Sequence, residues 1–358
     1  MTALRDEERP DRRAAAPDPW RLTLVAALVA SLLAACSSGD ADDEPSAASS
    51  VSASRSSSPS AASTADQVSP SAHVVTGLTD VFLSSGAGLV VAFNPQGVVA
   101  IDPETEQVRW RADVTGSDAA VGLGSVWVAD FDANLVRRLD VHTGQVRAEI
   151  PVPDNPIAIM IHRGQIWVAA HRGGSVSRID PGSNEVASVT RVGPTGPRGP
   201  MDVAAAGDSV FVGVFSTNQV VRLDASSAKV TRRFTLPQGV YACGGMTPDR
   251  SVLWVTSCLE GDHVARVDLR TGQVTSSGAL RMYVGEGVLR GDLIWFAGRP
   301  ASSSVPPGFV GLDRRTLEVV GRLETEDTLD GSVAAFGSWW VTQGDGVARF
   351  RLDDLVPR

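Results

Sequence analysis

The fold is decided by the stretch Gly124 to Ile150, GSVWVADFDANLVRRLDVHTGQVRAEI. Within it, Ser125 to Ala129 (SVWVA) carries apolar residues in succession, so both faces of that strand must be covered. Turn-forming residues separate this run from a second β-rich run, Leu135 to Asp140, and His142-Thr143-Gly144 forms a tight connection to a third. The stretch therefore predicts an antiparallel meander that packs between neighbouring sheets.

The same pattern recurs along the rest of the chain. Its aromatic position is occupied in turn by Trp127, Trp167, Phe211, Trp254, Trp295 and Trp340, and a weaker copy is centred on Val90. Successive copies are 37 to 45 residues apart, which is the period of a four-stranded propeller blade. We therefore predict an all-β domain over residues 72–358, folded as a seven-bladed β-propeller.

The two ends of this domain indicate how the ring closes. The seventh repeat contains three strand patterns, and the chain ends before a fourth. Ala72 to Leu78 precedes the first complete repeat and is similar to a fourth strand such as Glu318 to Leu323. We expect it to complete the last blade, so that no sheet edge is left open.

The residues before the propeller predict export and anchoring. In residues 1–35, the apolar run Leu22 to Leu33 is too short to span a bilayer and is typical of a signal peptide. Leu33-Ala34-Ala35-Cys36 resembles a bacterial lipobox, which makes Cys36 the lipidated residue. Residues 36–71 are rich in Ser and Ala and predict a disordered tether. The expected location is the outer face of the cytoplasmic membrane, with the lipid as anchor.

Composition limits the partners. The net charge is −9, and the predicted propeller has no basic run, which argues against a nucleic acid. Of the 32 basic residues, only Lys229 is a lysine, a bias typical of a high-GC genome such as that of an actinobacterium. We expect a monomer that contacts the membrane through its lipid.

Two cysteines remain beside Cys36. Cys243 and Cys258 both fall in the fifth repeat, and the extracytoplasmic compartment permits a disulfide. If Met246 to Ser251 forms a regular hairpin connection, however, the two residues do not sit opposite each other. The sequence leaves the bond open.

Ligand sites on propellers usually lie at the mouth of the central channel, where loops vary on a rigid scaffold. The two tyrosines of the chain are expected at neighbouring positions on one rim of this mouth. The alternative to a ligand site is that the loop side chains only contact solvent or fill the channel. The candidate ligand-binding residues are His171, Arg172, Tyr241, Glu260, His263, Tyr283, Glu286 and Arg299.

The repeats GSVWVADFDANLVRRLDVHTGQV and GQIWVAAHRGGSVSRIDPGSNEV resemble those of YVTN-type and NHL-like β-propellers, including the group related to streptogramin (virginiamycin B) lyase. The resemblance covers all seven repeats and implies the propeller fold. The lyase group further implies a metal-assisted elimination by two histidines and a glutamate at the channel mouth. Here His171 and His263 lie in suitable loops, and Glu286 is the nearest acid.

Two functions follow as expectations. No Gly-x-Ser-x-Gly elbow, closely spaced metal set or phosphate loop is present, which favours a non-catalytic binding or scaffold module for a protein, peptide or envelope ligand. The alternative is a lyase-like (carbon-oxygen lyase) or lactonase-like enzyme that uses His171, His263 and Glu286. Only that alternative calls for a cofactor, a divalent metal such as Mg²⁺.

Overall fold

The computed structural model describes residues 66–258, 261–329 and 331–355. The predicted signal peptide, Cys36, most of the predicted tether and Glu260 lie outside these residues. No helix within the described ranges has the length and apolar character needed to cross a bilayer.

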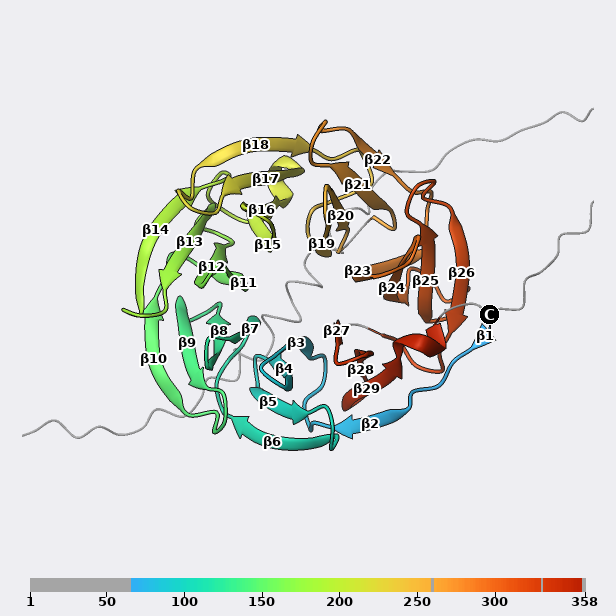
Figure 1. Cartoon of the computed structure of the whole chain (residues 1–358), viewed down its shortest axis with the longest axis horizontal. Coiled ribbons are helices and arrows are strands. Elements are labelled where there is room, and N and C mark those ends of the chain that lie inside the picture. Colours follow the sequence, from blue (N-terminus) through green and yellow to red (C-terminus); the bar gives the residue numbers. More distant parts are fainter. Residues whose placement is uncertain (1–65, 259–260, 330, 356–358) are drawn as a thin grey trace, which may run out of the picture. The chain divides into compact units, whose positions relative to one another are not determined.

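Seven sheets stand around a central channel, as predicted (Figure 1). Blade 1 contains β3 (Phe82–Gly86), β4 (Leu89–Asn94), β5 (Gly97–Asp102) and β6 (Gln107–Ala112). Blade 2 contains β7 (Asp118–Gly122), β8 (Ser125–Asp130), β9 (Leu135–Asp140) and β10 (Val146–Pro151). Blade 3 contains β11 (Pro156–His162), β12 (Gln165–Ala170), β13 (Ser175–Asp180) and β14 (Glu185–Arg191). Blade 4 contains β15 (Pro200–Ala206), β16 (Ser209–Val214), β17 (Gln219–Asp224) and β18 (Val230–Thr235).

The remaining blades include strands from the start of the described chain. Blade 5 contains β19 (Gly245–Asp249), β20 (Val252–Thr256), β21 (Val264–Asp268) and β22 (Val274–Ser276). Blade 6 contains β23 (Met282–Arg290), β24 (Leu293–Pro300), β25 (Gly308–Asp313), β26 (Val319–Glu324) and β1 (Asp66–Gln67). Blade 7 contains β27 (Ser332–Ala335), β28 (Ser338–Gln343), β29 (Gly346–Arg351) and β2 (Ala72–Val75). Two short 3₁₀ turns are Phe215–Thr217 and Leu352–Leu355.

The first strand of each blade is the innermost one. Figure 1 shows β3, β7, β11, β15, β19, β23 and β27 nearest the axis, and the later strands of each blade lie further out. The loops from second to third strand and from fourth to next first strand therefore lie at one end of the channel, where the inner strands begin. We call this end the mouth.

The aromatic residue of each repeat is buried between its own blade and the next one. Trp127, Trp167, Trp254, Trp295 and Trp340 are all at most 1% exposed. Trp127 packs in one cluster with Ile159 of the following blade, and the other anchors do the same with their own neighbours. Burial of one such ring contributes roughly 2–3 kcal/mol, so the period found in the sequence is the period of the core.

The aspartates at the ends of the third strands have a structural role. The Oδ1 atom of Asp140 accepts hydrogen bonds from the backbone N–H groups of His142 and Thr143, at 3.0 and 2.9 Å. Asp102, Asp268 and Asp313 make the same turn in their own blades. These Asx-type turns fix the outer hairpins.

The closing strand lies where the sequence predicts it. β2 pairs antiparallel with β29, from Ala72 opposite Arg349 to Val75 opposite Gly346. The paired segment is shorter than the predicted Ala72 to Leu78, because the backbone N–H groups of Thr76 and Gly77 bond instead to the Asp345 carbonyl.

The first described strand lies inside the predicted tether. Asp66 and Gln67 fall in the predicted disordered tether, yet they form β1 and pair parallel with Leu323 and Glu324 of β26. Asp66 and Gln67 pair there because the outer edge of β26 carries backbone N–H and C=O groups that would otherwise have no partner in the sheet. The first described residues therefore cross from blade 6 to blade 7.

Cys243 and Cys258 form a disulfide, with a Cα–Cα distance of 5.1 Å. The register argument against this bond was wrong, because the β19–β20 turn consists only of Arg250 and Ser251. Gly245 pairs with Thr256, and continuing the same register outward places Cys243 opposite Cys258.

Candidate functional site

His171 begins the loop between the second and third strands of blade 3 and is only 7% exposed. Its Nε2 accepts the backbone N–H of Arg198 at 3.3 Å, so Nδ1 carries the proton and donates to the Pro200 carbonyl at 3.2 Å. Burial lowers the pKa of the ring, which keeps it neutral. Both nitrogens are thus used to hold the loop that enters blade 4.

Tyr241 lies in the loop that enters blade 5. Its ring packs on Phe215 of blade 4 at a centroid distance of 5.3 Å, and the Arg198 guanidinium lies 5.2 Å from the same Phe215 ring. The backbone N–H of Tyr241 donates to Ser257 Oγ at 2.9 Å. These contacts form an arginine–aromatic stack at the mouth.

Tyr283 makes a second stack of this kind one blade further on. It lies in β23, directly opposite Arg299 of β24, and the Arg299 guanidinium lies 5.3 Å from the Tyr283 ring. Among the described ring contacts, the two tyrosine rings do not touch each other. Tyr241 precedes its inner strand and Tyr283 lies within one, so the two tyrosines do not stand at matching entries to their blades.

The other predicted residues are spread along the rim. His263 Nδ1 lies 3.1 Å from Asp262 Oδ1, but without the alignment of a hydrogen bond. Asp262 Oδ2 accepts the backbone N–H of Arg281 at 2.8 Å and so ties the loops of blade 5 together. Arg172 is exposed beside His171.

Glu286 differs from the rest because it belongs to a group in the channel. Asp118, Asp202 and Glu286 lie on the inner strands β7, β15 and β23, in blades 2, 4 and 6. We call these three residues the channel triad. Of the three, Glu286 alone is predicted from the sequence as a site residue.

A repeat signal could have identified all three. Asp118, Asp202 and Glu286 each stand nine residues before an aromatic anchor, Trp127, Phe211 and Trp295 respectively. The same offset gives small residues in the intervening blades, Ala158, Gly245 and Gly331. The Cγ atom of Glu286 would lie 3.0 Å from a Cβ at Gly245, so the small residue makes room for the carboxylate chain.

Asp118 accepts a backbone N–H group of the next inner strand, and Asp202 lies near such a group. Asp118 Oδ2 accepts the Ile159 N–H at 2.7 Å. Asp202 Oδ1 accepts its neighbouring Val203 N–H at 2.7 Å, and Oδ2 lies buried near the Met246 N–H without full hydrogen-bond geometry. Inner strands have no partner on their channel side, so these carboxylates satisfy donors that the ladder leaves free.

The triad shares a strong electrostatic perturbation. Burial, opposed by its hydrogen bonds and reinforced by the Glu286 charge, raises the pKa of Asp118 to about 7. Burial and the charges of Glu286 and Asp118 raise the pKa of Asp202 well above its usual range. Desolvation in the channel also raises the pKa of Glu286 to about 7, although this residue is the most exposed of the three.

The structure does not gather His171, His263 and Glu286 into one cluster. They belong to blades 3, 5 and 6, and both His171 nitrogens already have partners. Within the described ranges, no three or more His, Cys, Asp or Glu side chains are arranged to hold a metal ion. The mouth instead offers stacked arginines and aromatic rings above an acidic channel.

The fold defines the class: the protein is a seven-bladed β-propeller. Comparison with protein-family models gives no match, and comparison with curated protein sequences gives none. Among solved structures, it is similar to a chain of Kuenenia stuttgartiensis hydrazine synthase, with a TM-score of 0.62 and 16% identity over 78% of this chain and 98% of that one. It is also similar to BamB from Moraxella catarrhalis, with a TM-score of 0.59 and 12% identity over 81% and 99%. At these identities the likeness concerns the fold.

Proposed function

We propose that this protein is a lipid-anchored extracytoplasmic β-propeller that acts as a non-catalytic binding or scaffold module, with its ligand site at the channel mouth. The fold and its BamB-like neighbour are compatible with such a role. The ligand class is a protein, peptide or other envelope component.

The observation that carries the proposal is the pair of arginine–aromatic stacks over blades 4 to 6. Arg198 with Phe215 and Tyr241, and Arg299 with Tyr283, place aromatic rings and guanidinium groups at the mouth. Tyrosine and arginine are enriched among the residues that dominate binding energy in protein interfaces, and tyrosine buries a large area at a small entropic cost.

Site-specific photocrosslinking in the source cells tests the mouth. A benzophenone side chain at Tyr241 is expected to give a discrete crosslinked product, because the ring lies in the proposed interface. The matched control is the same group at Phe336, which is 45% exposed in the β27–β28 turn at the other end of the channel. Products from Phe336 alone, or no product from Tyr241, would refute a mouth-centred site.

Anchoring is tested separately. We expect Cys36→Ala to move the protein from the membrane fraction to the soluble fraction, because the lipid is the proposed anchor. If Cys36→Ala stays in the membrane fraction, lipidation at Cys36 is contradicted. The proposed binding site at the mouth does not depend on this result.

A further inference from the structure

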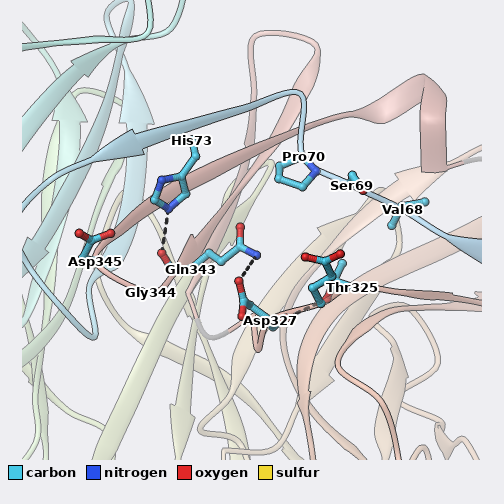
Figure 2. A pocket seen from close by; sticks show the side chains of 10 residues that line it. Val68, Ser69, Pro70, His73, Thr325, Asp327, Gln343, Gly344 and Asp345 are labelled. Carbon is cyan, nitrogen blue, oxygen red and sulfur yellow. Dashed lines mark hydrogen bonds between the residues drawn. The ribbon is translucent and has the colours of Figure 1, made fainter.

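A separate pocket lies where blades 6 and 7 meet, on the mouth side of the ring. Its volume is about 360 Å³. Two loops form its floor, residues 325–327 after β26 and residues 343–345 between β28 and β29. Figure 2 shows these loops beneath the first described residues of the chain. None of the candidate residues predicted from the sequence lines it.

The roof of the pocket is the segment 66–75, which we call the strap. The strap is fixed on blade 6 by the Val68 N–H, which donates to the Glu324 carbonyl at 2.9 Å. It is fixed on blade 7 by the Ser71 N–H, which donates to the Arg349 carbonyl at 2.7 Å. The pocket therefore has walls held by backbone bonds on both sides.

The lining is acidic. Glu326, Asp327 and Asp345 contribute three carboxylates, and no Lys or Arg is among the lining residues. The Glu326 and Asp345 carboxylates have no hydrogen-bond partner among the described residues. Three anionic groups around one cavity favour a positively charged occupant.

Gln343 gives an independent indication of a ligand. It is only 8% exposed, and its Nε2 donates to Asp327 Oδ2 at 2.9 Å. Figure 2 shows the amide nitrogen turned toward Asp327 and the amide oxygen turned to the opposite side. That oxygen accepts no hydrogen bond from any described residue, and Gln343 lines the pocket, so the oxygen is available to a donor that enters it.

The dimensions favour an organic cation over a metal ion. The described acidic and histidine side chains form no group arranged for metal coordination. The volume instead falls at the lower end of the range for small-molecule pockets, roughly 300–1,000 Å³. Val68 and Pro70 add apolar wall beside the carboxylates, which suits the methylene stem of a basic side chain.

We propose that this pocket binds a guanidinium or primary ammonium group, as carried by arginine or lysine. The cation donates to Gln343 Oε1 and is paired with the Glu326 and Asp345 carboxylates, while Val68 and Pro70 cover its stem. The site is distinct from the mouth site of the proposed function, and neither proposal depends on the other.

Isothermal titration of the full chain tests the proposal, with Nα-acetyl-arginine amide as the probe. Nα-acetyl-citrulline amide has the same shape without the charge, and we expect it to bind at least about tenfold more weakly. Glu326→Gln and Asp345→Asn each remove one charge at constant shape, and we expect the double variant to weaken arginine binding by about tenfold or more. The matched control is Asp132→Asn, an exposed carboxylate on the mouth side of blade 2, which should leave binding unchanged.

Three results would overturn the proposal: equal affinity for the citrulline probe, arginine binding that is unaffected by the double variant, and stoichiometric Ca²⁺ binding that the double variant abolishes. The chain carries its own Arg55 upstream of the strap, so the titration is repeated in Arg55→Ala. Binding seen only in that variant would assign the pocket to the chain itself and refute an external ligand.

Two further probes distinguish the source of the cation. n-Butylguanidinium that binds as tightly as the acetylated arginine amide indicates a free small cation. Tighter binding of the arginine amide, by about tenfold, indicates a basic side chain on a partner peptide, because the peptide groups then contribute contacts of their own.

Discussion

At the residue scale, Asp118, Asp202 and Glu286 illustrate what a single sequence can and cannot reveal. Their common offset from the aromatic anchors was available in the sequence. That they face one another across a channel follows only once the alternate blades 2, 4 and 6 are placed around a ring. Ligand-binding residues were expected in loops, whereas these three lie on the inner strands β7, β15 and β23.

The raised pKa of Asp118 predicts an unusual pH dependence of stability. A carboxyl group with a folded-state pKa of about 7 and an unfolded value of 3.8 binds its proton more tightly in the folded state. Its ionisation in the fold is therefore unfavourable, and stability falls as pH rises from about 4 through 7. Asp118→Asn should reduce the loss of stability between pH 5 and pH 8 by on the order of 2 kcal/mol, a figure discounted because Asp118 is only half-buried.

Urea unfolding at several pH values measures how the free energy of unfolding changes with pH in each variant. Asp224→Asn serves as the control, because hydrogen bonds from Ser226 and Ser227 hold the pKa of Asp224 well below its usual range, outside the window tested. A pH slope in Asp118→Asn equal to that of the parent protein would show that the fold does not raise the pKa of Asp118.

At the element scale, the β19–β20 hairpin decides the position of the loops on either side of it. Its two-residue turn sets the register, and the register sets Cys243 opposite Cys258. The sequence predicted both strands but not the exact turn, because a shift of one residue changes which side chains face each other. The length of the β19–β20 turn was thus what the sequence did not provide for predicting the disulfide.

Removal of this disulfide should loosen the mouth before it unfolds the ring. Cys243→Ser with Cys258→Ser is expected to lower the free energy of unfolding by about 1–3 kcal/mol, since the crosslink closes a short loop. The larger effect should be local, with faster amide exchange around Tyr241, which the bond holds near Ser257. Hydrogen exchange by mass spectrometry measures it. Uniform exchange throughout blade 5 would instead indicate a global role.

At the scale of the whole molecule, the periodic core made the fold predictable. Seven buried anchors at regular spacing fix the number of blades, and the missing fourth strand of the last repeat fixes the closure. The mouth loops and the strap do not follow the period, because no core position constrains them. The stacks, the disulfide register and the pairing of Asp66 and Gln67 with β26 therefore required the structure.

Closure by β2 predicts a sharp truncation boundary. A chain that starts at Ala62 retains both strap strands and should unfold like the full chain. A chain that starts at Gly77 loses the whole strap, including the buried Val74, and exposes the edge of β29. We expect it to lose at least about 3 kcal/mol of stability and to aggregate through that edge. Thermal unfolding and light scattering compare the two, and equal behaviour would contradict closure by β2.

The route of the strap has a mechanical consequence. Tension applied to the chain upstream of Asp66 reaches the two residues of β1 first and β2 only afterwards. Peeling of β1 would draw Val68 and Pro70 away from the acidic pocket while the ring stays shut. A pull on the leading end of the chain would thus release whatever the pocket holds at a lower force than the one that opens the propeller.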